Sequence, residues 1–180
     1  MEAGSSQHVE PWLRGPLPGV HTLLAPTLSA FAQAREAIAR WTAGLTDDEI
    51  WSRPHGVEPV GFHLRHIAGS VERLTAYIAG RQLTSEQLEA IRHEMDSDRG
   101  RTMLLDDVSQ SLHRSEQVIC ALDPAGFEQA RGVGRKQLPT TVIGLVVHLA
   151  EHTQRHVGEL IVTAKLARGW EAGRTRPRHS

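Results

Sequence analysis

The chain has 180 residues, enough for one domain whose hydrophobic core needs no disulfide support. Its 20 Lys and Arg residues balance 21 Asp and Glu residues, and no basic stripe indicates a nucleic-acid partner. One cysteine excludes an internal disulfide and a thiolate-rich zinc module, whereas histidine is unusually frequent, with 11 copies. No apolar run reaches the roughly 20 residues of a membrane span, and the first residues lack a signal-peptide pattern, so we expect a cytoplasmic protein without a membrane partner.

The first part of the chain predicts an arm followed by a helix. Residues 1–17 contain glycine, serine and two prolines and are expected to form an N-terminal arm. Apolar residues then recur with a helical period over about 18–41, and Pro26 either begins the regular helix or kinks an earlier turn. Gly44 ends this helix. Thr46-Asp47-Asp48-Glu49 is typical of a capping box that opens one short helical turn.

Two further long helices are predicted in the middle of the chain. One runs from Pro59 to about Ala79, because its apolar residues alternate between four and three positions apart. Thr84-Ser85-Glu86-Gln87 matches a second capping box, which predicts a short helix to about residue 93. The next long helix covers about 102–122, and its apolar surroundings favour Cys120 as a small core residue.

The C-terminal part predicts a loop, a last long helix and a tail. Residues 123–139 form the loop, Pro139 introduces a helix that continues to about Arg168, and residues 169–180 form a basic tail. No segment shows sustained strand alternation, so the predicted fold class is all-α, with residues 18–168 forming a four-helix bundle. The long connection between the second and third long helices is able to cross the bundle, which allows up-down-down-up topology.

Three histidines lie four residues apart in the last predicted helix: His148, His152 and His156. Residues at this spacing share one helix face, and two of their imidazoles can bind the same metal ion. A helical wheel places His156 inside the apolar stripe, His152 on its flank and His148 towards the polar side. Periodicity therefore favours the pair His152 and His156. The alternative is that some of the three are solvated helix histidines and that His156 is a hydrogen-bonded core residue.

The second long helix offers His63 and His66 as a third ligand. The wheel places His63 nearer the core, so periodicity favours His63. If this helix and the last one are antiparallel, His66 and His156 lie at heights that agree within a turn, which makes a shared site feasible. The sequence contains no Glu-x-x-His, which argues against a ferritin-like di-iron centre, and no His-Glu-x-x-His, which excludes a zincin protease.

Two segments resemble motifs of the DinB/YfiT superfamily: Gly61-Phe62-His63-Leu64-Arg65-His66-Ile67-Ala68-Gly69-Ser70 and His148-Leu149-Ala150-Glu151-His152-Thr153-Gln154-Arg155-His156-Val157-Gly158. The resemblance covers about residues 17–168 in helix order and in the long second connection. It implies a four-helix bundle, often a homodimer, in which three histidines hold a divalent metal.

The motif positions that match the family's metal ligands are His66, His152 and His156. The resemblance therefore replaces His63 by His66 on the second long helix and leaves His63 as a neighbouring group. Glu159 stands where the family commonly has glutamine, and this difference is able to alter the charge near the site.

The same resemblance implies an activity, since characterised relatives include enzymes that use low-molecular-weight thiols as cofactor or co-substrate. The leading hypothesis is a metal-dependent transferase, or an isomerase, that uses such a thiol on a small electrophilic substrate. Three imidazoles leave an open position, as in catalytic sites, and zinc, nickel or iron would suit them. The alternatives are a metal-dependent hydrolase, a non-catalytic metal-binding or stress-response protein, and a dimerisation module with structural histidines. No side chain is assigned as a catalytic acid or base.

Overall fold

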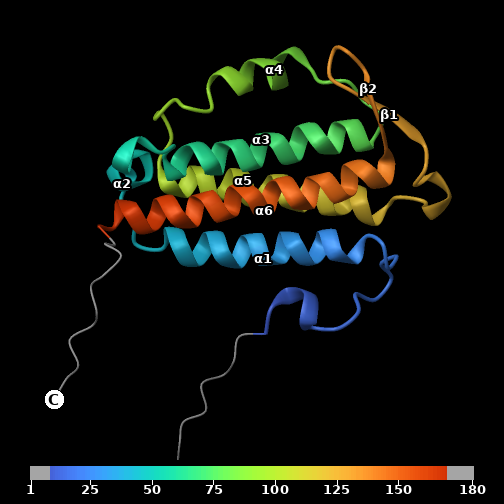
Figure 1. Cartoon of the computed structure of the whole chain (residues 1–180), viewed down its shortest axis with the longest axis horizontal. Coiled ribbons are helices and arrows are strands. Elements are labelled where there is room, and N and C mark those ends of the chain that lie inside the picture. The colour runs from blue at the N-terminus through green and yellow to red at the C-terminus, as the bar shows by residue number, and fades with distance from the viewer. Residues whose placement is uncertain (1–8, 170–180) are drawn as a thin grey trace, which may run out of the picture.

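The structure is a computed structural model that describes residues 9–169. Within this range the chain forms six α-helices, three short 3-10 helices and one two-stranded antiparallel sheet. The longest helices lie side by side (Figure 1): α1 (Ala25–Thr42), α3 (Val60–Ile78), α5 (Arg101–Cys120) and α6 (Val142–Ala167). None of the helices in the described part of the chain is both long and apolar enough to cross a membrane.

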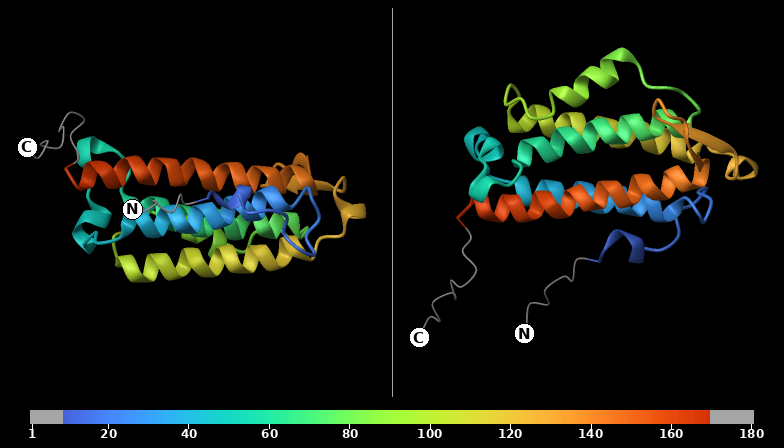
Figure 2. Two further views of the ribbon diagram at one scale, coloured as in Figure 1. Left: turned by 90° about the horizontal axis from the view of Figure 1, so that it is seen from below. Right: turned by 45° about the horizontal axis from the view of Figure 1, so that its top comes forward.

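The long helices run in two directions. In Figure 1, α3 and α5 run one way, and α1 and α6 run the opposite way. α1 packs against α6, and α3 packs against both α5 and α6, an arrangement that Figure 2 shows from two further sides. Residues 79–100 return along the outside of α3 and carry the short helix α4 (Ser85–Arg92). Because of this return, α3 and α5 run parallel although they are consecutive long helices.

Local sequence signals explain where several helices begin. Pro26 lies in the first turn of α1, where its missing N–H costs no hydrogen bond, so of the two predicted roles of Pro26 the helix start is correct. The side chains of Thr46 and Thr84 each form a capping box, as predicted, and open α2 (Asp47–Trp51) and α4.

The predicted loop before the last helix contains a β-hairpin. Strands β1 (Ala130–Val133) and β2 (Leu138–Thr141) pair antiparallel, so the expectation of no strand was wrong here. Pro139 lies within β2 rather than at the start of the helix. Instead, Thr141 caps α6, because its hydroxyl oxygen accepts a hydrogen bond from the backbone N–H of Gly144.

The hydrophobic core lies where the long helices meet. Its fully buried side chains come from every one of these helices and include Phe31, Leu64, Ile67, Val71, Leu104, Leu112, Leu149 and Leu160. The burial of these apolar stripes fixes how α3 and α6 are rotated about their axes, and therefore which side of each helix its histidines occupy. Cys120, at the end of α5, is exposed, so its predicted place in the core was wrong.

The described part of the predicted arm contacts α1. The 3-10 helix η1 (Pro11–Leu13) buries Pro11. Both terminal nitrogens of Arg14 donate to the carboxylate of Glu36, at 2.6 and 2.9 Å. Residues 1–8 of the arm lie outside the described residues, as does the predicted tail beyond Gly169.

The short helix α2 holds the end of the long connection where α5 begins. The carboxylate of Asp47 accepts a hydrogen bond from the backbone N–H of Arg101 at 2.7 Å, and the indole N–H of Trp51 donates to the carbonyl of Arg99 at 2.7 Å. The Trp51 ring also lies against Gly61, where a Cβ atom would approach it to 2.7 Å. A glycine at the start of α3 is therefore required for this contact.

Candidate metal centre

Three histidines from two helices converge where α3 meets α6. His66 comes from α3, and His152 and His156 come from successive turns of α6; one ring nitrogen of each lies within 4.8 Å of the other two. The Nε2 atoms of His66 and His152 are 3.0 Å apart, and the rings of His66 and His156 have centroids 4.2 Å apart. Nitrogen ligands on one tetrahedral zinc ion are roughly 3.3 Å apart, so these spacings suit a shared cation.

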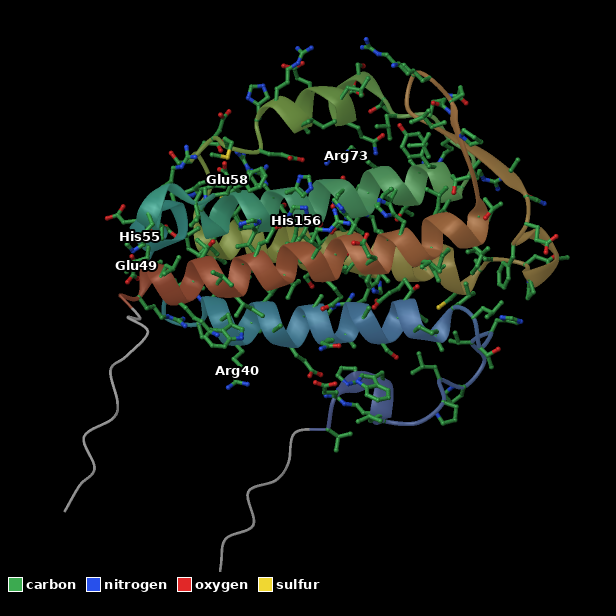
Figure 3. The ribbon with its side chains drawn as sticks, viewed as in Figure 1. Arg40, Glu49, His55, Glu58, Arg73 and His156 are labelled. Carbon is green, nitrogen blue, oxygen red and sulfur yellow. The ribbon has the colours of Figure 1, made fainter. Side chains whose placement is uncertain are left out.

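The histidines lie at the edge of the core rather than inside it. The side chain of His66 is 20% exposed and that of His156 is 13% exposed, whereas their neighbours Ile67 and Val157 are buried. Figure 3 labels His156 on the side of α6 that faces α3. A cation held here would be shielded by protein and still be reachable by a small molecule.

A buried carboxylate, that of Glu94, contacts the ring nitrogen of His66 that faces away from His152. Nδ1 of His66 lies 2.7 Å from Oε2 of Glu94, a residue that is only 8% exposed. An ionised carboxylate can only accept hydrogen bonds, so Nδ1–H of His66 is the donor and Nε2 keeps its lone pair. Burial acts to raise the pKa of Glu94, but the hydrogen bond from His66 and the positive charge of Arg73 hold it below its ordinary value.

His156 has a second carboxylate partner. Its Nδ1 lies 3.0 Å from Oε2 of Glu159, one helical turn further along α6. A carboxylate at this distance favours the His156 proton on Nδ1, which leaves its Nε2 for the group of three histidines. Both His66 and His156 are therefore held by carboxylates in the tautomer that a metal bound through Nε2 requires.

His63 lies next to this group and not within it. It is 3% exposed, and its Nδ1 lies 3.5 Å both from Nδ1 of His156 and from Oε2 of Glu159. The wheel correctly placed His63 nearer the core than His66, but the deeper residue is not the one that meets His152. His63, His156 and Glu159 form a second group whose ligand atoms lie within 4.8 Å of one another.

The environment disfavours the charged forms of His63, His152 and His156. Burial, reinforced by the neighbouring histidines, lowers the pKa of His152 to about 4. Burial likewise lowers the pKa of His63 to about 4, against the opposing charge of Glu159, and lowers the pKa of His156. A neutral imidazole offers a lone pair without first losing a proton, so His152 and His156 are ready to bind a cation near neutral pH.

His148 lies outside the group. Its side chain is 50% exposed, and its Nδ1 lies 3.2 Å from the carboxylate of Glu151 on the solvent side of α6. This position agrees with the wheel, which placed His148 towards the polar side of the helix.

A cavity opens beside the histidines. It has a volume of about 660 Å³, and its walls include His63 and Glu159 together with Val57, Arg155 and Val162. This volume falls within the range of small-molecule sites. Because His63 and Glu159 both contact His156, the cavity borders the histidine group.

The sequence reasoning missed Glu94. It follows the short helix α4, in a turn without apolar periodicity, and nothing in its neighbours distinguishes it from the other acidic residues nearby. The only available signal was indirect: the long connection after α3 had to pass close to the helix that carries His66.

The donor set indicates the kind of cation that would fit. Neutral imidazoles suit zinc, nickel and iron, whereas magnesium and calcium prefer oxygen ligands. No thiolate takes part, since the exposed Cys120 is the chain's single cysteine.

Comparison with known proteins gave a family match over most of the chain. The sequence profile of the DinB superfamily matches residues 30–160, which include α3, the long connection and most of α6. No curated protein gave a significant match to the chain.

Proposed function

The chain belongs to the DinB superfamily, and from this membership we propose that it is a metal-binding four-helix bundle of up-down-down-up topology. In this proposal His66, His152 and His156 hold one divalent metal ion. The observation that carries the proposal is the convergence of three imidazoles, two of which have a carboxylate on the opposite ring nitrogen. Solvated surface histidines have no need of this second layer of contacts.

We further propose that the protein is a metal-dependent transferase, or an isomerase, that uses a low-molecular-weight thiol on a small electrophilic substrate. A divalent metal held by His66, His152 and His156 would supply a Lewis acid that lowers the pKa of a bound thiol. The role of the surrounding residues is to position the imidazoles and the substrate. Glu94 and Glu159 orient His66 and His156, and the cavity beside His63 and Glu159 admits a small molecule.

The experiment that tests this proposal combines metal analysis with an activity screen. Protein purified without a histidine tag is expected to contain about one divalent metal per chain. Glutathione, mycothiol and bacillithiol are then each supplied with a halogenated electrophile, and thioether formation is followed by mass spectrometry with and without a chelator. Turnover that needs both the thiol and the metal supports the proposal.

The other outcomes identify the alternatives. Metal-dependent cleavage of ester or amide substrates without any thiol would indicate a hydrolase. Stoichiometric metal without turnover in either assay would indicate a binding or stress-response protein. Absence of metal from the purified protein, together with no uptake of added zinc, nickel or iron, would overturn the metal centre itself.

We also propose that the protein is a cytoplasmic homodimer, as the family resemblance implies. Sedimentation equilibrium over a range of concentrations tests the dimer, because a monomeric mass at micromolar protein would contradict it. Fractionation of the source cells tests the compartment.

A further inference from the structure

We propose that Glu94 is a positioning residue for the metal centre. The segment that follows α4 (residues 93–98) presents Glu94 to His66 and so decides which ring nitrogen of His66 faces His152 and His156. This inference deepens the proposed function and rests on its metal centre, but the orientation of His66 can be measured without metal.

The contact between Glu94 and His66 is short and shielded from water. Oε2 of Glu94 lies 2.7 Å from Nδ1 of His66, and Oε1 of the same carboxylate accepts a hydrogen bond from Arg73 at 2.9 Å. Figure 3 labels Arg73 on the side of α3 that faces α4. Both carboxylate oxygens thus contact side chains of α3, one that of His66 and the other that of Arg73. These two contacts fix the direction from which Glu94 approaches the imidazole.

Polar contacts from α3 also hold the chain on both sides of Glu94. Arg65, the residue before His66, donates to the backbone carbonyls of His93 and Asp96 at 2.5 and 2.6 Å. It also pairs with the carboxylate of Asp98 at 2.6 Å. Arg65 therefore binds the segment before and after Glu94.

Apolar burial does not account for this placement. α4 has no buried residue, and its apolar side chains Leu88 and Ile91 are 39% and 43% exposed. Burying an ionised carboxylate costs free energy that its ion pair only partly offsets. The segment is therefore held over α3 mainly by its polar contacts, and the contact to His66 is one that a purely structural connection would not need.

The chemistry of the contact favours metal binding. A carboxylate that accepts the N–H of a ligating imidazole selects the tautomer, restrains the ring and makes the other nitrogen a better donor. Glu159 makes the equivalent contact to His156 at 3.0 Å, but its side chain is 49% exposed. Water competes with Glu159, whereas the buried Glu94 has no such competition. We therefore expect Glu94 to restrain His66 more strongly than Glu159 restrains His156.

The first test measures zinc affinity by competition with a chromophoric chelator. Glu94→Ala is expected to weaken binding about 10–100-fold, the usual effect of removing such an outer acceptor. Glu94→Gln retains an oxygen that accepts from His66, so its loss should be smaller than that of the alanine variant. The control is Glu89→Gln on α4, whose carboxylate contacts only Arg92 and His93 among the described contacts and should leave affinity within about twofold of wild type.

The second test reads the tautomer of His66 in the metal-free protein by long-range ¹H–¹⁵N NMR of the imidazole ring. Wild type and Glu89→Gln are expected to carry the proton on Nδ1. In Glu94→Ala the proton should redistribute towards Nε2, the nitrogen needed for metal. A role confined to stability would lower the melting temperature and leave this signature unchanged.

The outcomes separate the two proposals. If wild type binds no metal but His66 carries its proton on Nδ1 only when Glu94 is present, the proposed function fails and the positioning role stands. An unchanged tautomer in Glu94→Ala, or zinc affinity within threefold of wild type, overturns the positioning role. If the alanine variant does not fold, the same two measurements on Glu94→Leu decide, because leucine fills the buried space but offers no acceptor to His66: wild-type affinity together with the proton still on Nδ1 rejects the role.

Discussion

The Nε2 atoms of His66 and His152 lie 3.0 Å apart, although the two residues are separated by 86 positions in the chain. Two imidazole nitrogens that both carry lone pairs repel each other at this distance, so a proton or a cation must lie between them. Because Nδ1–H of His66 donates to Glu94, Nε2 of His66 carries the lone pair. The proton or cation between the two rings is therefore bound to this lone pair. A divalent cation would replace a single proton here and gain His156 as a third donor.

Removal of any one ligand is expected to abolish stoichiometric metal. His66→Ala, His152→Ala and His156→Ala should each retain less than about one tenth of the wild-type metal after dialysis, since two imidazoles hold a cation far more weakly than three. Elemental analysis of untagged protein measures the content. His148→Ala, which removes an exposed histidine of α6, is the matched control and should keep about one metal per chain.

The same measurement tests the second group of possible ligands. A wild-type content of two metals per chain would contradict the single centre and point to His63, His156 and Glu159 as an additional site. His66→Ala would in that case still retain metal.

Acid is expected to destabilise the metal-free protein below about pH 6.5. Burial lowers the pKa of His63 from 6.5 to about 4, so between these values the unfolded chain binds a proton that the folded chain does not. The free energy of unfolding therefore increases with pH in this window. As the pH falls from 6.5 to about 4, His63 alone is expected to reduce it by up to about 3 kcal/mol. Urea unfolding in the presence of a chelator at several pH values measures the slope.

His63→Gln separates this effect from the rest of the acid response. The variant should show a flatter dependence of unfolding free energy on pH than wild type, whatever its absolute stability. Equal slopes would mean that His63 is protonated as readily in the folded protein as in the unfolded chain.

The packing of α6 predicts a contrast between two neighbouring apolar residues. Leu149 is fully buried, so Leu149→Ala should cost about 2–5 kcal/mol of unfolding free energy through the cavity that it leaves. Val147 is 59% exposed, and Val147→Ala should change stability by less than about 0.5 kcal/mol. Thermal or urea unfolding of both variants measures the difference. Similar costs for the two would contradict the rotation of α6 that places its histidines towards α3.

Two helical glycines should respond to alanine with opposite signs. At Gly61 a Cβ atom would lie 2.7 Å from the Trp51 ring, so Gly61→Ala should destabilise by about 1–3 kcal/mol. At Gly158 nothing lies within 4 Å of the added Cβ atom, so Gly158→Ala should stabilise α6 by about 0.5–1 kcal/mol. Melting temperatures of the pair give the signs directly. Stabilisation by Gly61→Ala would show that the Trp51 ring moves aside freely.

The long helices could be predicted because each carries its own local evidence. The apolar stripe of α3 and the capping boxes of Thr46 and Thr84 depend only on neighbours in the chain, and these helices start within a few residues of the prediction. The hairpin β1–β2 has strands of four residues each, too short to show alternation, and Pro139 stands inside the second. The only local signal was the glycine-containing turn of residues 134–137, which is equally typical of an irregular loop.

The candidate site likewise contains residues that local spacing could indicate and residues that depend on how distant segments pack. Spacing identified His152 and His156, because both lie on one helix, whereas the choice between His63 and His66 depended on how α3 and α6 approach each other. The wheel preferred the more buried His63, and the family resemblance supplied His66. The assignment of these three as ligands stays a prediction. Glu94 was beyond either method, since its contact to His66 is made from a turn that follows no helical period.

The histidine group also sets an order of events during synthesis. His66 emerges from the ribosome well before His152 and His156, which lie in α6, the last helix of the described chain. A growing chain that lacks α6 therefore offers a single member of the group. Contacts between such distant segments form only after the loop between them has closed. Metal loading of the proposed centre is consequently expected to wait until α6 has been synthesised and has packed against α3.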